Sequence, residues 1–134
     1  MPGSFFDSNV VLYIASGEAN KADRAEQLLR GGGTISVQVL NETANVARRK
    51  MELNWLQLRS FLSRIRGLAT VMPLTVETHE MGLALAERHG FSTYDAMIVA
   101  SALQADCDVL WSEDLHHGLM IDNRLQVLNP FRAA

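Results

Sequence analysis

Short hydrophobic runs alternate along the chain with longer stretches of helical periodicity. The runs that predict strands lie at residues 4–7, 34–37, 69–72, 108–112 and 125–128. The stretches between them predict helices over about 9–15, 21–30, 38–51, 56–66, 75–89 and 94–105. Strands that alternate with helices are typical of an α/β fold, so we expect a three-layer α/β/α sandwich with a mainly parallel central sheet.

Two of these helices have patterns that matter for function. The helix over 38–51 carries an apolar stripe made of Leu40, Thr43, Ala44, Ala47 and Met51. Glu42 and Arg49 lie seven residues apart and fall nearly opposite this stripe, on one shared polar face. The helix over 94–105 is almost wholly apolar and predicts a central, buried helix.

Turn signals separate the elements, but none of them divides the chain into domains. Gly31-Gly32-Gly33 lacks a following Gly-Lys-Ser/Thr, so it is interpreted as a helix C-cap and turn rather than a phosphate-binding loop. Gly90 ends the helix that Thr75 caps. No repeat, low-complexity tract or Pro/Ser-rich linker occurs, so we expect a single domain over residues 1–134.

Composition places the chain among ordinary globular proteins. Its 134 residues are 48% hydrophobic and 20% charged, which excludes wholesale disorder and allows a core without stapling disulfides. The one cysteine, Cys107, cannot form an internal disulfide. No apolar run approaches the roughly 18 residues of a membrane span, and the start lacks the basic region of a secretory signal. We therefore expect a cytoplasmic protein that does not enter a membrane.

The net charge of −3 hides a segregation of charge along the chain. Residues 21–66 carry nine bases and four acids, whereas residues from 67 onward carry three bases and nine acids. A basic half beside an acidic half suggests a polyanion held near carboxylates that need a cation, or an acidic partner. Ordinary solvated helix faces would give the same count.

Four acids stand out by position. Asp7 closes the first strand, Asp114 follows the strand over 108–112, Asp95 opens the buried helix, and Glu42 lies on a polar helix face. Sites in parallel sheets form beyond the carboxyl ends of the strands, where these acids would meet. Each also has an ordinary role: Asp7 as an N-cap, Asp95 in the capping pattern Ser92-Thr93-Tyr94-Asp95, Glu42 as a solvated residue and Asp114 as a turn residue.

As a group, the four acids favour a hard cation. Clustered carboxylates repel one another unless a cation lies among them. Carboxylate oxygens without Cys or His ligands favour Mg²⁺ or Mn²⁺, and His116 and His117 lack further ligands at zinc spacing. Such a metal activates water and neutralises charge on a phosphodiester that undergoes displacement.

Four segments in order resemble the motifs of the PIN-domain family, specifically of VapC-type toxins. They are residues 6–13, which contain Asp7, residues 36–42, which end in Glu42, residues 90–96, which contain Asp95, and residues 110–118, which contain Asp114, followed by Asn129-Pro130-Phe131 at the usual ending. The resemblance runs over essentially the whole chain. It implies a Mg²⁺- or Mn²⁺-dependent endoribonuclease, the toxin of a toxin–antitoxin system, restrained by a VapB-like antitoxin and forming a homodimer.

The resemblance also implies roles for individual residues. Asp7, Glu42, Asp95 and Asp114 match the catalytic quartet, with Asp7, Asp95 and Asp114 as the metal ligands. Asn9 and Ser112 match small polar residues that border the site and the substrate. Arg49 could contact the RNA backbone, although a base near a helix C-terminus equally complements the helix dipole. The sequence leaves open whether Glu113 or Asp122 takes the place of Asp114 as the fourth acid of the quartet.

Two other functions compete with a ribonuclease. A receiver-like phospho-acceptor domain expects adjacent acids after the first strand and a late lysine, but Asp7 stands alone there and no lysine follows Lys50. A catalytically inactive PIN-like binding module would have lost some of the motif acids, and all four are present. A metal-dependent ribonuclease is therefore the leading prediction.

Overall fold

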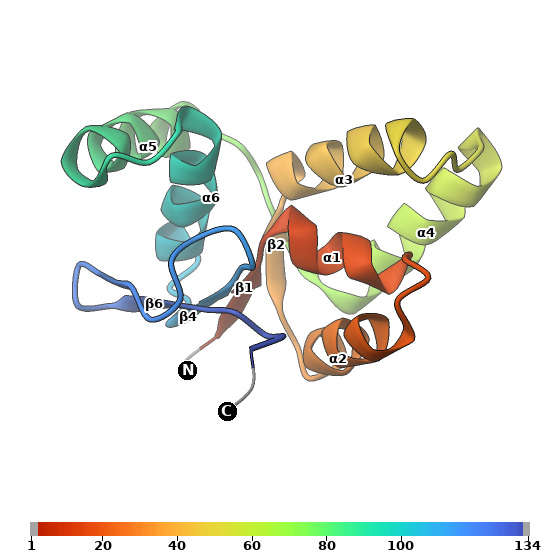
Figure 1. Ribbon diagram of the computed structural model, residues 1–134. Helices are drawn as coiled ribbons and strands as arrows, with labels where there is room; N and C mark the ends of the chain where they lie inside the picture. Colours follow the sequence, from red (N-terminus) through yellow and green to blue (C-terminus); the bar gives the residue numbers. More distant parts are fainter. Residues whose placement is uncertain (1–2, 133–134) are drawn as a thin grey trace.

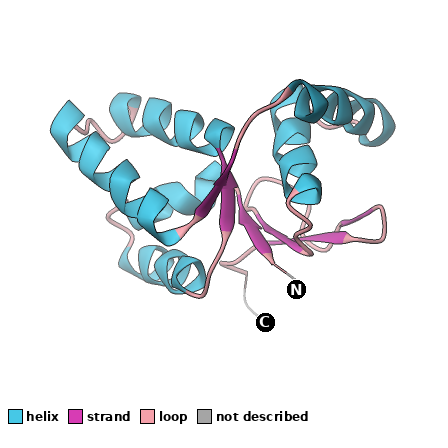
Figure 2. Cartoon of the chain, turned by 180° about the vertical axis from the view of Figure 1, so that it is seen from behind, coloured by secondary structure: helices cyan, strands magenta, loops and turns pink. Residues whose placement is uncertain are grey.

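The computed structural model describes residues 3–132 and places a six-stranded sheet between two groups of helices (Figure 1). Figure 2 shows the sheet in the middle, with α1–α4 on one side and α5 and α6 on the other. The predicted three-layer α/β/α sandwich is therefore confirmed. No helix within residues 3–132 has both the length and the apolarity to cross a bilayer.

The sheet consists of β1 (Ser4–Phe6), β2 (Thr34–Ser36), β3 (Thr70–Met72), β4 (Val109–Trp111), β5 (Met120–Ile121) and β6 (Leu125–Leu128). Its strand order is β3-β2-β1-β4-β6-β5. All neighbours pair parallel except β5, which is antiparallel to β6. The chain progresses from β1 to one side and later returns to β4 on the other side, which makes the carboxyl ends of β1 and β4 a topological switch point.

The helices are α1 (Ser8–Ile14), α2 (Ala19–Arg30), α3 (Val37–Arg49), α4 (Trp55–Leu68), α5 (Val76–His89) and α6 (Thr93–Gln104). All six predicted helices occur. Only the short strand β5 was missed, because two residues carry no detectable periodicity.

Side-chain caps fix the starts of the helices that lead into the site. Asp7 is the N-cap of α1, directly after β1. The Ser36 hydroxyl accepts a hydrogen bond from the Val39 amide and starts α3. The Ser92 hydroxyl accepts from the Asp95 amide and starts α6, as the capping pattern predicts. Each cap therefore places the first turns of a helix at the carboxyl edge of the sheet.

The core lies on both sides of β1, and α6 contributes more buried residues to it than any other helix. The eight consecutive residues from Ala96 to Leu103 are all buried, which confirms the predicted central helix. Phe5 and Phe6 of β1 are fully buried as well. Helix α5 packs closely on α6, since a side chain at Gly82 would overlap the Met97 sulfur.

The buried face of α3 differs from the predicted stripe. Its buried residues are Gln38, Val39, Thr43 and Ala47, whereas Leu40 and Ala44 are only partly covered. The difference arises because α3 contacts α1 and β2 as well as α4. These contacts cover Gln38 and Val39 in its first turn, which the predicted stripe did not include. Glu42 therefore lies half-buried at the border of this face, not opposite it, while Arg49 is exposed.

Candidate active site

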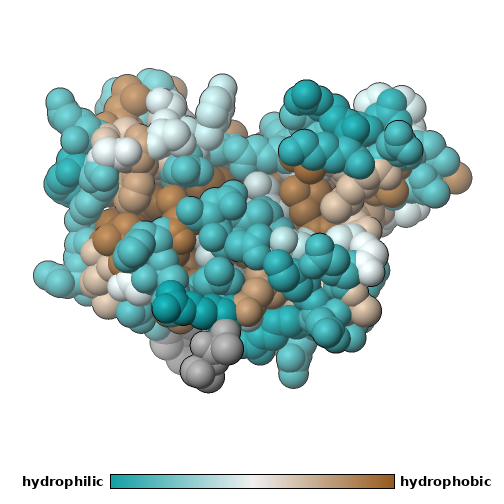
Figure 3. All heavy atoms as spheres, in the orientation of Figure 1, coloured by the Kyte–Doolittle hydropathy of each residue, from teal (hydrophilic) through white to brown (hydrophobic). Residues whose placement is uncertain are grey.

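Three of the four predicted acids gather near the carboxyl ends of β1 and β2. Asp7 follows β1, Glu42 projects from the second turn of α3, and Asp95 lies in the first turn of α6. The charges of Glu42 and Asp95 both act on Asp7 and raise its pKa. We refer to Asp7, Glu42 and Asp95 as the acid cluster. Figure 3 shows the surface dipping between the lobe of α5 and α6 and the lobe of α3 and α4.

Asp7 is only 4% exposed, which is unusual for a carboxylate. One carboxylate oxygen, Oδ1, accepts from the Ser8 amide at 2.7 Å, and Oδ2 accepts from the Ser112 hydroxyl at 2.9 Å. Burial raises the pKa of Asp7 to about 6, the hydrogen bonds from Ser112 and Ser8 oppose this shift, and the neighbouring acids add to it. Within residues 3–132, no Lys or Arg pairs with it.

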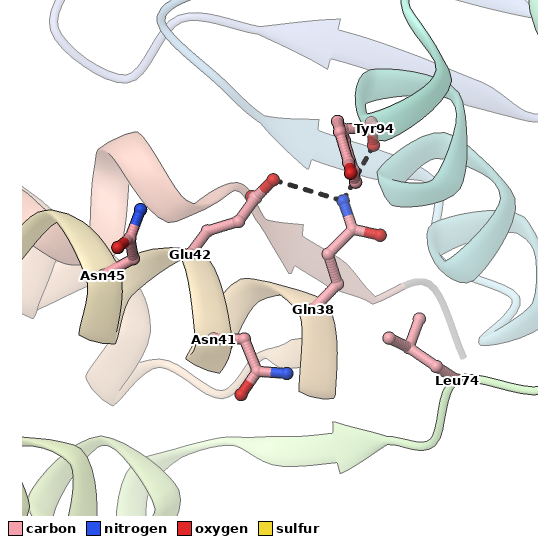
Figure 4. A pocket seen from close by; sticks show the side chains of 6 residues that line it. All are labelled: Gln38, Asn41, Glu42, Asn45, Leu74 and Tyr94. Carbon is pink, nitrogen blue, oxygen red and sulfur yellow. Dashed lines mark hydrogen bonds between the residues drawn. The ribbon is translucent and has the colours of Figure 1, made fainter.

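Glu42 is tied to the rest of the site by neutral donors. The Ser8 hydroxyl donates to Glu42 Oε1 at 3.1 Å, and Gln38 Nε2 donates to Oε2 at 3.3 Å. Gln38 Nε2 also donates to the Tyr94 carbonyl oxygen at 2.9 Å (Figure 4). Ser8 and Gln38 thus join α1, α3 and α6. No sequence pattern singled out Ser8 or Gln38, although Gln38 stands one helical turn before Glu42, a spacing that brings side chains together.

Asn9 and Ser112, which the sequence predicts to border the site, both contact Asp7. Ser112 is fully buried, and its hydroxyl donates to Asp7 and accepts from the Leu115 amide at 3.2 Å. Its hydroxyl therefore orients Asp7. Asn9 Nδ2 lies 3.4 Å from Asp7 Oδ2, and Asn9 Oδ1 accepts from the Glu113 amide at 3.1 Å. Asn9 consequently holds the segment after β4 against α1.

Glu113 belongs to a separate cluster in which its charge is compensated. The Tyr13 hydroxyl donates to Glu113 Oε1 at 2.9 Å, and Lys21 Nζ donates to Oε2 at 3.0 Å. Lys21 Nζ also lies 4.5 Å from the Tyr13 ring centroid and 5.2 Å from that of Phe131. The Glu113 carboxylate holds the pKa of Lys21 above its usual range. We call Tyr13, Lys21, Glu113 and Phe131 the lysine cluster.

The other predicted residues lie apart from the acid cluster. Asp114 is exposed in the segment after β4, and within residues 3–132 its side chain has no hydrogen bond or ion pair. Arg49 is exposed, about 10 Å along the α3 axis from Glu42 by the helical rise. Asp122 pairs with Arg88 at 2.8 Å in the turn between β5 and β6. That ion pair accounts for Asp122 without a role in the site.

The donor set suits a divalent cation, although the side chains do not form a finished metal site. A buried carboxylate beside two further acids is stabilised by a bound cation, and oxygen ligands favour Mg²⁺ or Mn²⁺. Within residues 3–132, no three His, Cys, Asp or Glu side chains lie close enough to hold one metal ion. Asp7 and Glu42 are instead oriented by hydroxyl and amide donors. A third carboxylate, from Asp95 or Asp114, would have to turn toward them.

Basic side chains of residues 21–66 are spread over α2, α3 and α4, but several are already engaged. Arg48 donates to the Leu53 carbonyl oxygen and stacks over Trp55, while Arg64 pairs with Glu26. Arg59 and Arg66 line an open pocket of about 370 Å³ between α3 and α4. Arg59 and Arg66 therefore lie at a concave surface on which an anionic partner could bind.

Comparison with known proteins gives one family and a set of similar structures. The profile of the PIN domain family matches residues 4–118. No curated protein matches the sequence at a significant level. A toxin–antitoxin complex from Klebsiella pneumoniae is similar with a TM-score of 0.74 and 19% identity, over 98% of this chain and 100% of that one.

Two further structures share this architecture. VapC20 from Mycobacterium tuberculosis, a toxin that cleaves the sarcin–ricin loop, aligns with a TM-score of 0.68 and 18% identity over 84% of this chain and 92% of that chain. VapBC2 from Rickettsia felis, bound to a DNA fragment from its promoter, aligns with a TM-score of 0.68 and 19% identity over 94% of this chain and 97% of that chain. At these identities the likeness establishes the fold.

Proposed function

Because the chain belongs to the PIN-domain family, we propose that it is a Mg²⁺- or Mn²⁺-dependent endoribonuclease and the toxin of a toxin–antitoxin system. The observation that carries this proposal is Asp7, a buried carboxylate whose only close ionic neighbours among residues 3–132 are the acids Glu42 and Asp95. A charge buried in this way is stabilised by a cation from outside the chain. We further propose that residues 1–134 form a single domain.

The proposed metal ligands are Asp7, Asp95 and Asp114, with Glu42 as the fourth catalytic acid. A divalent ion bound there would polarise the phosphodiester, stabilise its developing charge and activate water. The Ser112 hydroxyl and the Ser8 amide fix the orientation of Asp7. Exposed Asp114 is free to turn toward Asp7, because no contact within residues 3–132 holds its side chain.

Glu42 is the member of the acid cluster that faces open space. It lines an open pocket of about 530 Å³, while Ser8 and Gln38 hold its two oxygens. We therefore assign Glu42 the role of accepting a proton at Oε1 or Oε2 from the water that attacks the phosphodiester. Arg49, on the same helix, is assigned to the RNA backbone.

Partners follow from the same proposal. RNA is the substrate, since VapC20 cleaves the sarcin–ricin loop, and a VapB-like antitoxin is the inhibitor, since the Klebsiella structure is a toxin–antitoxin complex. The guanidinium groups of Arg59 and Arg66 suit an acidic segment of such an antitoxin. We also propose a homodimer that acts in the cytoplasm, where RNA and antitoxin are both present.

The proposal is tested by cleavage of RNA with purified protein. Wild type should cut RNA with Mg²⁺ or Mn²⁺ and stop when EDTA is added. Asp95→Asn should lower the rate by at least about 10²-fold, because it removes a charged group from the site. The matched control is Asp108→Asn, an exposed aspartate at the amino end of β4, which should retain the wild-type rate.

Two results would contradict the proposal. Undiminished cleavage by Asp95→Asn with EDTA present would exclude a metal-dependent mechanism at this site. Metal binding by wild type in calorimetry, without any RNA cleavage, would instead identify a catalytically inactive binding module.

A further inference from the structure

An open pocket of about 530 Å³ adjoins the acid cluster and is lined by Gln38, Asn41, Glu42, Asn45, Leu74 and Tyr94 (Figure 4). We call it the amide pocket, because three of these side chains are carboxamides. A second pocket of about 230 Å³ shares Gln38, Leu74 and Tyr94 and extends it toward α5. These volumes fall near the range of about 300–1,000 Å³ for ligand sites.

The amide pocket has the chemistry for an uncharged, planar, polar group. None of its six lining residues is Lys or Arg, so the pocket offers no positive charge to bind a phosphate. Asn and Gln side chains pair with the edges of nucleobases through a donor and an acceptor together. Within residues 3–132, the side chains of Asn41 and Asn45 make no hydrogen bonds, and both residues are exposed. Their amides are therefore available to a ligand.

The wall opposite these amides is aromatic. Tyr94 is 70% exposed although it directly precedes Asp95, and Leu74 of the segment before α5 is 44% exposed. Figure 4 shows Gln38 and Glu42 pointing toward Tyr94. Gln38 Nε2 donates a hydrogen bond to the Tyr94 carbonyl oxygen at 2.9 Å, which fixes the start of α6 beside α3. The backbone of Tyr94 is held in this way while its ring is exposed, and an exposed aromatic ring offers a face on which an unpaired base can stack.

We propose that the amide pocket binds one unpaired nucleobase of the RNA, next to the phosphodiester that the acid cluster cleaves. Tyr94 stacks on the base, and Asn41 and Asn45 bind its edge. The inference rests on the proposed function, since Glu42 lines the pocket and also belongs to the acid cluster. Only single-stranded segments can supply such a base, because a paired base is stacked within its helix.

The stacking is tested by removing the base and the ring in turn. The full-length chain carrying Asp95→Asn binds a single-stranded RNA that spans a mapped cleavage site, and one abasic nucleotide is moved through each position around that site. At one position, the missing base should weaken binding by about 5- to 150-fold. Adding Tyr94→Ala should weaken binding of the intact RNA by a similar factor and remove the penalty at that position.

Two control variants separate stacking from a loss of structure. Tyr94→Trp keeps a ring and should keep the penalty at the same position. Trp55→Ala removes a ring that is 61% exposed but lines a different pocket, and it should leave the penalty unchanged. Thermal unfolding checks that each variant is folded.

The hydrogen-bonding role is tested by the sequence preference of cleavage. In a randomised RNA library, Asn41→Ala or Asn45→Ala should change the preferred base at the position found by the abasic scan. Asn20→Ala, an exposed asparagine on α2, should not change it.

The outcomes distinguish the two proposals. If wild type neither binds nor cuts RNA, the proposed function and the pocket fail together. If wild type cuts RNA but Tyr94→Ala keeps every abasic penalty of its parent, the pocket assignment is overturned and the proposed function stands.

Discussion

Asp7 and Glu113 follow two neighbouring parallel strands and contact the same side chain, Asn9, yet their surroundings are opposite. Asp7 is buried, accepts only neutral donors, and lies near Glu42 and Asp95. Glu113 pairs with Lys21 and accepts from the Tyr13 hydroxyl. The lysine cluster therefore neutralises its own carboxylate, whereas within residues 3–132 no Lys or Arg side chain pairs with Asp7.

This difference has an energetic cost, which supports the proposal that the acid cluster is the functional site. The rise in the pKa of Asp7 from 3.8 to about 6 corresponds to about 3 kcal/mol of unfavourable interaction for the charged form. Such uncompensated groups concentrate at functional sites. In the lysine cluster, Lys21 Nζ lies 3.0 Å from Glu113 Oε2, so we interpret this cluster as a structural clamp that closes the segment after β4 onto α1 and α2.

The same chemical change in the two clusters should have unequal effects on cleavage. Asp7→Asn is expected to lower the cleavage rate by at least about 10²-fold, because it removes a charge at the reacting centre. Glu113→Gln keeps an acceptor for Tyr13 and should lower the rate by less than about tenfold. Single-turnover cleavage of one RNA measures both. An equal loss in the two variants would place Glu113 in the catalytic group.

The acid cluster should make the metal-free protein less stable as the pH rises. The folded state binds the Asp7 proton more tightly than the unfolded state, so this stabilising contribution is full below pH 3.8 and is lost as the pH passes about 6. The loss amounts to about 3 kcal/mol. Urea unfolding in EDTA across this range should show the loss in wild type and in Glu113→Gln. An equal loss of stability with rising pH in Asp7→Asn would show that a different titratable group causes it.

Bound metal should reverse this destabilisation. A ligand at 100 times its Kd stabilises the folded state by about 2.7 kcal/mol, so Mn²⁺ should raise the Tm of wild type and of Glu113→Gln. Asp7→Asn and Asp95→Asn should lose most of this rise, because they remove carboxylates of the acid cluster. Scanning calorimetry with increasing Mn²⁺ measures it. An undiminished rise in both aspartate variants would place the metal elsewhere.

Ser112→Ala tests the orientation of Asp7 with a smaller effect. The Ser112 hydrogen bond lowers the pKa of Asp7, so its removal should raise that pKa further and cost about 1 kcal/mol or somewhat more at neutral pH. The pH at which metal-free stability falls should move upward. Ser101→Ala, a buried hydroxyl without a hydrogen-bond partner within residues 3–132, is the matched control and should leave it unchanged.

The smallest effect is expected from Lys21→Met, which keeps the apolar stem but removes the charge. Lys21 and Glu113 are both partly exposed, so salt screens their attraction. The Tm should fall slightly at low salt, with the difference from wild type shrinking at high salt. Cleavage should stay near wild type, and a loss as large as that of Asp7→Asn would contradict a purely structural clamp.

Local sequence patterns were sufficient for most of the fold and for the acids themselves. Ser92 and Thr75 identify helix starts, Gly90 with its positive φ of 77° identifies a helix end, and the apolar run after Tyr94 identifies the central helix. The hairpin between β5 and β6 was missed, although Asp122 and Asn123, which both have a φ of 53°, tolerate the left-handed conformation its turn needs. Helix caps, helix ends and turns depend on residues that are close together in the sequence, so they can be predicted from the sequence alone.

The tertiary structure decided which of these charges have an oppositely charged partner within residues 3–132 and which have none. Lys21 and Glu113 are 92 residues apart, Ser8 and Glu42 are 34 apart, and Gln38 reaches a carbonyl 56 residues away. Electrostatic and hydrogen-bond energies depend on distance in space, not on separation along the chain. The sequence by itself therefore determined the elements and the acids at their ends. Packing around β1 decided that Asp7 is buried among acids while Glu113 is paired with a lysine.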